Sequence, residues 1–190
     1  HLWAVRPAVF IWNHRSLIDT QVVSRLVQRD FGAVAGKDRQ KSPLFAAASR
    51  FMHIAFVDRD DSRAAVAALE PATRLLGEGM SMLVAPESTR PAGEGIGEFR
   101  RDAFRLAMAA KVPVVPIVIR NVGDIGSLRS GAMRPGVVDV AVLLERRPAD
   151  FDWNVLLSGR PRRTEAVACT IRLAARLLGA AAALREGGRN

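Results

Sequence analysis

The chain has no tyrosine, one cysteine and three histidines. The lone Cys169 excludes an internal disulfide and a cysteine-based metal cluster, and it suits a reducing compartment. No stretch reaches the roughly 18 uninterrupted apolar residues of a membrane-spanning helix, and the N-terminus lacks a basic region followed by an apolar segment. Because the first residue is His1 rather than methionine, we expect the chain to be a piece of a longer protein.

Arginine supplies most of the positive charge, since only Lys37, Lys41 and Lys111 are lysines. The net charge of +9 and the isoelectric point near 11.3 favour anionic partners such as phosphorylated metabolites, acidic lipid surfaces or nucleic acid. The arginines are scattered along the chain and no nucleic-acid-binding motif is found, so nucleic acid has little support as a partner. With 190 residues, 49% of them hydrophobic, the chain can form one sizeable core, and we expect one domain.

Strand-like runs alternate with helical patterns along the chain. Most strand-like runs are continuously apolar, as expected where helices cover both faces of a parallel sheet. We therefore predict a single α/β domain with a mostly parallel mixed sheet flanked by helices. The expected strands are 7–12, 31–35, 54–58, 81–85, 112–119 and 137–143, and the expected helices are 17–29, 42–52, 62–77, 99–110 and 164–186. Since Pro113 and Pro116 cannot donate to a ladder, we expect an edge strand, a bulge or a kink at 112–119.

The segment NHRSLID, residues 13–19, stands where the first strand is followed by the first helix. A histidine can take a proton near neutral pH, and a carboxylate on its other nitrogen fixes the tautomer and stabilises the imidazolium. Two residues five apart on a regular helix diverge by about 140°. His14 and Asp19 can therefore converge only if His14 lies in the turn before the helix and Asp19 in its first turn, and this junction suits a catalytic dyad.

A capped helix is the simpler interpretation of the same segment. Ser16 at the N-cap with Asp19 three residues later matches a capping box, which explains these two residues but leaves Asn13 and His14 unexplained. Ser16 is a poor candidate for a nucleophile, being close to His14 and suited to capping. A metal at His14 and Asp19 lacks a third ligand. We expect His53 to be a structural residue near a helix end.

Other polar residues follow the predicted strands. Ligands of parallel α/β sheets bind beyond the carboxyl ends of the strands. His14 follows the first strand, Arg59 the third, and Glu87 and Arg90 the fourth. Arginine offers a planar fork to phosphate oxygens, and a carboxylate can accept from a hydroxyl. The simpler alternatives are a solvated loop residue for Arg59 and a surface ion pair for Glu87 and Arg90.

Four segments resemble, in order and approximate spacing, the four blocks of the glycerolipid acyltransferases, typified by 1-acylglycerol-3-phosphate acyltransferase. They are NHRSLID, FVDRDD at 56–61, APESTR at 85–90 and VPVVPIVI at 112–119. The text from Gly36, GKDRQKSPLF, and from Phe99, FRRDAFRLAMAAKVPVVP, is also similar. The resemblance covers about positions 7–143. It implies a glycerol-3-phosphate acyltransferase-like fold, with an acyltransferase domain at 1–150 and a C-terminal helical extension of the same domain at 151–190.

The resemblance also implies a reaction. A fatty acyl group would pass from acyl-CoA or acyl-carrier protein to the free hydroxyl of 1-acylglycerol-3-phosphate, giving phosphatidic acid in phospholipid biosynthesis. His14 would be the general base and Asp19 would orient it, with no cofactor and no acyl-enzyme. The residues implied to hold the acceptor are Lys37, Arg59, Glu87, Ser88, Thr89 and Arg90. Pro116 falls in the implied acyl-chain region, although core packing is the simpler interpretation.

Two residues depart from the family pattern. Ser88 and Asp102 stand where the family usually has glycine, which leaves the identity of the acceptor open. A different lysolipid acceptor, or a catalytically impaired domain that binds lipid or regulates, is therefore an alternative. Because the substrates are insoluble in water and Arg172 and Arg176 lie one turn apart beside an apolar helix face, we expect a cytoplasmic protein peripheral to the inner face of the cell membrane. Simple packing of that helix on the sheet is the alternative.

Overall fold

The computed structural model describes residues 4–14, 16, 18–41, 43, 46, 47, 49, 52–57, 68–87, 100–127, 132–145 and 147. The expected helix at 164–186, Cys169 and the whole of 151–190 lie outside the described residues. Most of the expected helix at 42–52 does so too, although residues 43, 46, 47 and 49 are helical. Within the described part of the chain, no helix has the length and apolar character needed to cross a bilayer.

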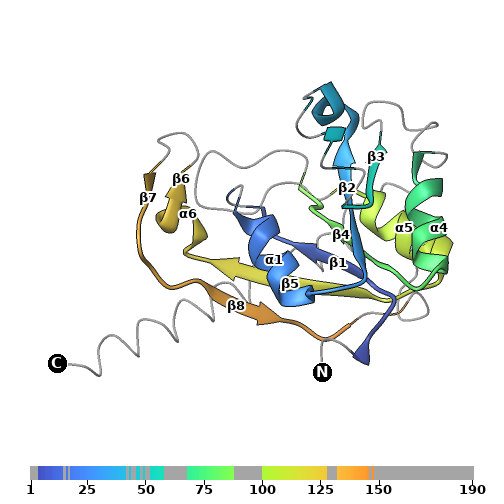
Figure 1. Cartoon of the computed structure of the whole chain (residues 1–190). Coiled ribbons are helices and arrows are strands. Elements are labelled where there is room, and N and C mark those ends of the chain that lie inside the picture. The colour runs from blue at the N-terminus through green and yellow to red at the C-terminus, as the bar shows by residue number, and fades with distance from the viewer. Residues whose placement is uncertain are drawn as a thin grey trace.

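A six-stranded sheet forms the centre of the fold (Figure 1). Its strands are β1 (Val9–Trp12), β2 (Phe31–Gly36), β3 (Ile54–Val57), β4 (Ser81–Val84), β5 (Val114–Arg120) and β8 (Asp139–Val142). Their order across the sheet is β3-β2-β4-β1-β5-β8. The first five strands pair in parallel, and only β8 runs antiparallel, against β5. The predicted mostly parallel mixed sheet is confirmed.

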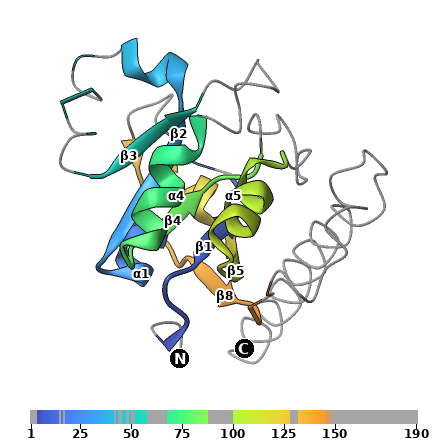
Figure 2. The same ribbon diagram turned by 90° about the vertical axis from the view of Figure 1, so that its right-hand side faces the viewer.

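Helices cover both faces of this sheet (Figures 1 and 2). The helices are α1 (Asp19–Val27), α4 (Glu70–Gly77), α5 (Asp102–Ala110), the short α6 (Val122–Ile125) and the 3-10 helix η2 (Lys37–Lys41). Val23 and Val27 of α1 pack with Phe10 and Ile117 on one face. Residues of α4 and α5 pack with the alternate strand residues on the other face. A two-stranded antiparallel pair, β6 (Gly126–Ser127) and β7 (Ala132–Met133), follows α6.

Burial along the strands follows from these layers. Every residue of β1 and β4 is buried, and so is β5 up to Ile119, because both faces of these central strands are covered. The continuously apolar sequences of these strands are explained in this way. In β2 and β3, buried and half-buried residues alternate. The sheet is therefore most completely enclosed around β1, the strand that leads to His14.

Of the three alternatives for 112–119, the edge strand is wrong, because β5 lies between β1 and β8. A parallel ladder uses the N–H groups of alternate residues. Since Val9 donates to the carbonyl of Pro113, the residues of β5 that bond β1 are Pro113, Val115 and Ile117. The missing N–H of Pro116 therefore faces β8, where the β5–β8 ladder ends at Val142. The proline interrupts only the end of one ladder and is tolerated inside the sheet.

Arg6 holds the C-terminal end of α1. Its guanidinium donates to the main-chain carbonyls of Val27 and Arg29 and lies 4.0 Å from the carboxylate of Asp30. Carbonyls at a helix C-terminus lack helical hydrogen-bond partners and carry partial negative charge. A guanidinium group supplies both the missing donors and a compensating positive charge. Burial lowers the pKa of Arg6 below its ordinary value, while Asp30 raises it and Arg29 lowers it. This contact fixes α1 against the segment that enters β1.

Candidate active site

The candidate residues lie at one edge of the sheet, where the parallel strands β1, β4 and β2 end. The pairing register aligns these strands through a row formed by Ile11, Val84 and Val34. Three residues after each member of that row stand His14 on the β1 segment, Glu87 on the β4 segment and Lys37 on the β2 segment. Neighbouring strands are about 4.8 Å apart, so the row from Ile11 to Val34 spans roughly 10 Å. The fold therefore gathers residues from three separate segments of the sequence.

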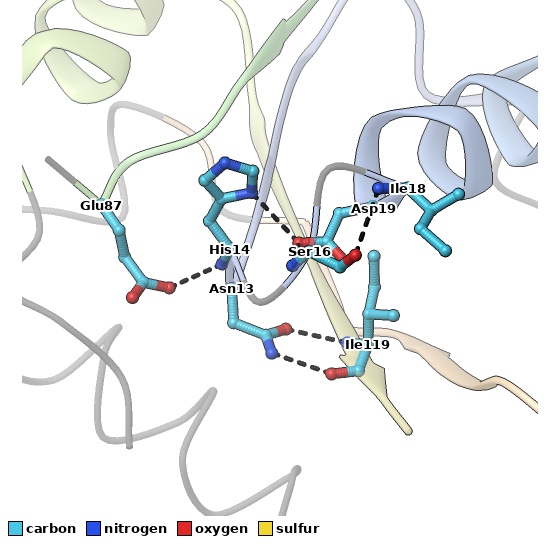
Figure 3. A network of polar contacts seen from close by, with 7 residues as sticks. All are labelled: Asn13, His14, Ser16, Ile18, Asp19, Glu87 and Ile119. Carbon is cyan, nitrogen blue, oxygen red and sulfur yellow. Dashed lines mark hydrogen bonds and ion pairs between the residues drawn. The ribbon is translucent and has the colours of Figure 1, made fainter. Parts of the chain in front are cut away.

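Asn13 extends the β1–β5 ladder beyond Trp12, the last residue of β1. Its Nδ2 donates to the carbonyl of Ile119, and its Oδ1 accepts the Ile119 N–H, each at 2.8 Å (Figure 3). The residue is 4% exposed. The side-chain amide thus takes the place of a peptide group. Because a buried peptide group without a partner costs about 1–3 kcal/mol, this pairing stabilises the point where the chain leaves the sheet.

His14 and Asp19 meet in the turn between β1 and α1. The distance from Nδ1 of His14 to Oδ2 of Asp19 is 3.0 Å, and Asp19 is completely buried. The same Oδ2 accepts the main-chain N–H of Ser16 at 2.7 Å. One carboxylate oxygen therefore holds both the imidazole ring and the turn that carries it. The expected convergence of these two side chains is confirmed.

The capping interpretation is partly right. The bond from the Ser16 N–H to the Asp19 carboxylate is the one a capping box requires, and the Ser16 Oγ accepts the Ile18 N–H at 3.4 Å. However, α1 begins only at Asp19, with Ile18 as its N-cap residue and no side-chain cap bond. Ser16 is therefore not the N-cap. The capping and dyad interpretations are compatible, because the same carboxylate serves both.

The second ring nitrogen of His14 is directed away from the carboxylate. An ionised Asp19 accepts from a protonated Nδ1, and this leaves a lone pair on Nε2. Figure 3 shows Nε2 on the side of the ring away from Asp19. The His14 side chain is 15% exposed. This arrangement can accept a proton from a bound hydroxyl group and later return it to a leaving group.

Glu87 contacts His14 from the neighbouring strand. Its Oε1 accepts the main-chain N–H of His14 at 2.7 Å, and the residue is only 2% exposed. This distance lies at the short end of the range of ordinary N–H···O hydrogen bonds. In Figure 3, Glu87 and Asp19 approach His14 from opposite sides. The ring is thus held by one carboxylate and the main chain by another.

The remaining predicted site residues fall into two groups. Lys37 is exposed at the start of η2, directly after β2, and Pro116 lies in the buried part of β5, in register with Ile11. The predicted residues outside the described part of the chain are Arg59, Ser88, Thr89 and Arg90. His53 directly precedes β3, at the opposite edge of the sheet from His14, and it does not join this group.

Two contacts of the site went beyond the sequence-based prediction. Asn13 was left unexplained, and its partner Ile119 is 106 residues away. Glu87 was expected at the acceptor, whereas the contact described here is to the His14 main chain. In the sequence, Asn13 could have been found by its position between a buried strand and the histidine. Glu87 could have been found because it lies two residues beyond the expected strand 81–85, as His14 lies two residues beyond the expected strand 7–12.

Asp102, one of the two residues in place of a family glycine, is balanced locally. It begins α5, and its carboxylate lies 3.2 Å from Nε of Arg100. An acidic residue in the first turn of a helix also interacts favourably with the helix dipole. The Arg100 N–H donates to the carbonyl of Pro86 at 2.7 Å, which ties this pair to the end of β4. The added negative charge is therefore paired where it arises.

In the described ranges, no three histidine, cysteine, aspartate or glutamate side chains gather closely enough to hold a metal ion. The chemistry available at this end of the sheet, as far as the structure describes it, is that of the His14–Asp19 pair.

Comparison with known proteins finds several 1-acyl-sn-glycerol-3-phosphate acyltransferases among the relatives. The chain is 30% identical over 138 residues to a 1-acyl-sn-glycerol-3-phosphate acyltransferase of Chlamydomonas reinhardtii, covering 72% of this chain and 41% of that protein. It is 31% identical over 137 residues to LPAT1, a chloroplastic 1-acyl-sn-glycerol-3-phosphate acyltransferase of Arabidopsis thaliana, covering 72% and 38%. The Haemophilus influenzae 1-acyl-sn-glycerol-3-phosphate acyltransferase is 30% identical over 173 residues, covering 80% and 72%. The chain thus spans less than half of the algal and plant proteins and most of the bacterial one.

A solved structure shares the fold. The 1-acyl-sn-glycerophosphate (LPA) acyltransferase PlsC of Thermotoga maritima matches with a TM-score of 0.69 and 22% identity, covering 94% of this chain and 67% of that chain. A family model described as Acyltransferase matches residues 2–120, which is more than half of the sequence and includes His14, Asp19 and Glu87. With this match, and the Haemophilus relative covered over most of its length, the chain belongs to the acyltransferase family.

Proposed function

We propose that the chain is an O-acyltransferase that moves a fatty acyl group from a thioester to the free hydroxyl of 1-acylglycerol-3-phosphate, giving phosphatidic acid. The observation that carries this proposal is the 3.0 Å contact between Nδ1 of His14 and the buried carboxylate of Asp19. The names of the relatives support this acceptor, since each acts on 1-acyl-sn-glycerol-3-phosphate by name.

The proposed reaction needs one base and no covalent enzyme intermediate. Nε2 of His14 takes the proton of the acceptor hydroxyl as its oxygen attacks the thioester carbonyl carbon. Asp19 stabilises the imidazolium that results. The carbon–sulfur bond then breaks, and the imidazolium returns the proton to the leaving thiolate, so the products are an ester and a free thiol. Positioned base catalysis contributes typically about 10²- to 10⁴-fold, and alignment of hydroxyl and thioester supplies much of the rest.

Binding of the negatively charged phosphate of the acceptor requires basic residues near His14. Lys37 lies in the same row as His14, two strands away, and a lysine side chain can span much of the intervening distance as a point charge for phosphate. We propose Arg59 and Arg90 as further phosphate ligands, with Ser88 and Thr89 beside them, on the strength of the family pattern. Pro116 remains our proposal for the acyl-chain region.

The donor and the location follow from the chemistry of the substrates. We propose acyl-CoA or acyl-carrier protein as the donor, with no further cofactor, because the thioester already carries the activated acyl group. The acceptor lies in a lipid surface, and the chain has a net charge of +9, which favours an anionic one. The proposed location is therefore peripheral, at the inner face of the cell membrane, within phospholipid biosynthesis.

The test is an acyl-transfer assay with mixed lipid vesicles. Purified protein is given 1-acylglycerol-3-phosphate or the matching monoacylglycerol without phosphate, with acyl-CoA and acyl-carrier protein as donors in parallel. We expect phosphatidic acid to form, the phosphate-free acceptor to be at least about 10²-fold poorer in kcat/KM, and His14→Ala to give background only. Lys37→Gln should raise KM for the acceptor, while Lys111→Gln, an exposed lysine at the far end of α5, should not.

A folded protein that transfers no acyl group to any acceptor with either donor would contradict the proposal. It would favour a lipid-binding or regulatory domain of the same fold. Equal use of the acceptors with and without phosphate would contradict the acceptor assignment alone, and it would point to a different lysolipid.

A further inference from the structure

We propose that Glu87 is a positioning residue, which holds the main chain of His14 in place and does not contact the acceptor. This inference rests on the proposed acyl transfer at His14 and identifies a contact on which that reaction depends. It differs from the role that the family pattern suggests for this carboxylate, which is a contact with the acceptor. The argument comes from the β1–β4 ladder, from the burial of Glu87 and from the reach of its side chain.

The ladder between β1 and β4 uses every second N–H of β1. Met82 donates to the carbonyl of Ala8, so the even-numbered residues of β1 face β4. In a continued ladder, the N–H of His14 would donate to the carbonyl of Pro86. That carbonyl instead accepts the N–H of Arg100 at 2.7 Å. The carboxylate of Glu87 takes over as acceptor for His14, at 2.7 Å.

The two neighbours of β1 therefore hold its end in matching ways. On the β5 side, the side chain of Asn13 reaches the main chain of Ile119. On the β4 side, the side chain of Glu87 reaches the main chain of His14. Figure 3 shows the two contacts on either side of the turn that carries the imidazole. Both replace ladder bonds at the point where the strand ends, so the catalytic turn is fixed from both strands.

Burial separates this role from contact with a substrate. Glu87 is 2% exposed, and its Oε1 is already used by a main-chain donor. A carboxylate so enclosed is well suited to fix protein groups and poorly placed to sample a diffusing acceptor. The position of His14 matters because a misplacement of about 1 Å in an active site can cost about 10²-fold in rate. Loss of the Glu87 contact is therefore expected to lower kcat while leaving acceptor binding nearly unchanged.

Three substitutions of Glu87 separate the two roles. Gln keeps an oxygen at the right distance and removes the charge, Asp keeps the charge and shortens the reach by one methylene, and Ala removes both. Positioning predicts that kcat falls by less than about tenfold in Glu87→Gln, and by about 10²-fold in both Glu87→Asp and Glu87→Ala, with KM for 1-acylglycerol-3-phosphate within about threefold. A hydrogen bond from an acceptor hydroxyl to Glu87 instead predicts that KM for 1-acylglycerol-3-phosphate rises in Glu87→Asp and Glu87→Ala.

The control is Glu78→Gln, which changes an exposed glutamate paired with Arg74 on α4, and it should match the native protein. Hydrogen exchange of the His14 amide, followed by NMR, provides a readout independent of turnover. The amide should be protected in the native protein and in Glu87→Gln, and unprotected in Glu87→Ala. Circular dichroism verifies that each variant is folded, so that a lost activity is not a lost structure.

The failure of this inference differs from the failure of the proposed function. If the native protein turns over and Glu87→Gln is as impaired as Glu87→Ala, or if KM rises with kcat unchanged, the positioning role is overturned. If the native protein does not turn over, the proposed acyl transfer fails. In that case, rapid hydrogen exchange of the His14 amide in the native protein would overturn the contact between Glu87 and His14. Protection of that amide in the native protein, lost in Glu87→Ala, would support the contact.

Discussion

Replacing Asp19 by asparagine removes a charge and retains nearly the same shape. The Asn side chain can place its oxygen where Oδ2 now lies, so that it still accepts the N–H of Ser16 and the Nδ1–H of His14. The interaction between the carboxylate and the developing imidazolium is lost, and an NH2 group replaces the buried Oδ1. The expected effect is therefore on kcat, with little effect on the folded structure.

The size of the effect follows from the geometry. Opposite unit charges about 4 Å apart interact by about 4 kcal/mol at an effective dielectric constant near 20, which is the order expected for the buried Asp19 and the largely buried His14. Each 1.36 kcal/mol corresponds to a factor of ten in rate. We expect Asp19→Asn to lower kcat by about 10³-fold. Asp19→Ala should also destabilise the protein by about 1–3 kcal/mol, because the Ser16 N–H loses its acceptor.

The assay is steady-state acyl transfer at saturating acceptor and donor, with thermal unfolding measured in parallel. Asp30→Asn is the matched control, since its side chain is 64% exposed just beyond α1. A folded Asp19→Asn protein that retains kcat within about threefold would refute the role assigned to the carboxylate. An equal loss in Asp30→Asn would show that the effect is not specific to the site.

Three further substitutions test the scaffold around the site by changes in the free energy of unfolding, measured in urea. Asn13→Ala removes two buried bonds to the main chain of β5 and is expected to cost about 2–4 kcal/mol. Arg6→Met leaves the last carbonyls of α1 without their charged donor, for an expected loss of about 1.5–3 kcal/mol. Gly32→Ala would place Cβ 2.5 Å from the carbonyl oxygen of His53, which is too close, so about 1–3 kcal/mol should be lost.

Two of these predictions, those for Asn13 and Gly32, have a matched control in the same chain. Asn121→Gly removes an exposed bond, to Asp139, and keeps a residue that tolerates the φ of 64° at this position, so stability should change by less than about 0.5 kcal/mol. Gly77→Ala adds a Cβ with nothing within 4 Å at the end of α4, and it should be neutral or stabilising. Unchanged stability in Asn13→Ala, Arg6→Met or Gly32→Ala would contradict the contact concerned.

The sequence predicted those features that depend on neighbouring residues. Continuous apolar runs identified β1, β4 and β5, because strands enclosed on both faces need no polar residues. The spacing of His14 and Asp19 identified their contact, because one turn between a strand and a helix is enough to bring them together. Helix α1 was expected two residues too early, since Ser16 resembled an N-cap although the helix begins at Asp19.

The features that the sequence did not predict depend on strand register. Glu87 and His14 are 73 residues apart, and their contact requires that β4 pair with β1 at one particular offset. The same holds for Asn13 and Ile119, across the β1–β5 ladder. Pro116 suggested an edge strand, but each strand inside a sheet pairs with a neighbour on either side. The missing N–H of a proline affects the pairing with only one neighbour, so a proline can lie inside a sheet where that pairing ends.

The structure also changes the interpretation of Asp102. As a departure from a family glycine, it leaves the identity of the acceptor open. Its carboxylate pairs with Arg100 at the start of α5, where both residues are partly buried. A partly exposed pair of this kind contributes about 1 kcal/mol or less. The other departure, Ser88, lies outside the described residues. The assay that compares acceptors with and without phosphate tests its effect.

The most direct test of the account is a single-turnover measurement of acyl transfer by the native protein and by His14→Ala, with both substrates saturating so that binding does not limit the rate. If His14 takes the hydroxyl proton, the native protein should form the new ester at least about 10²-fold faster than the folded variant. Equal rates of ester formation in the two proteins would contradict the account.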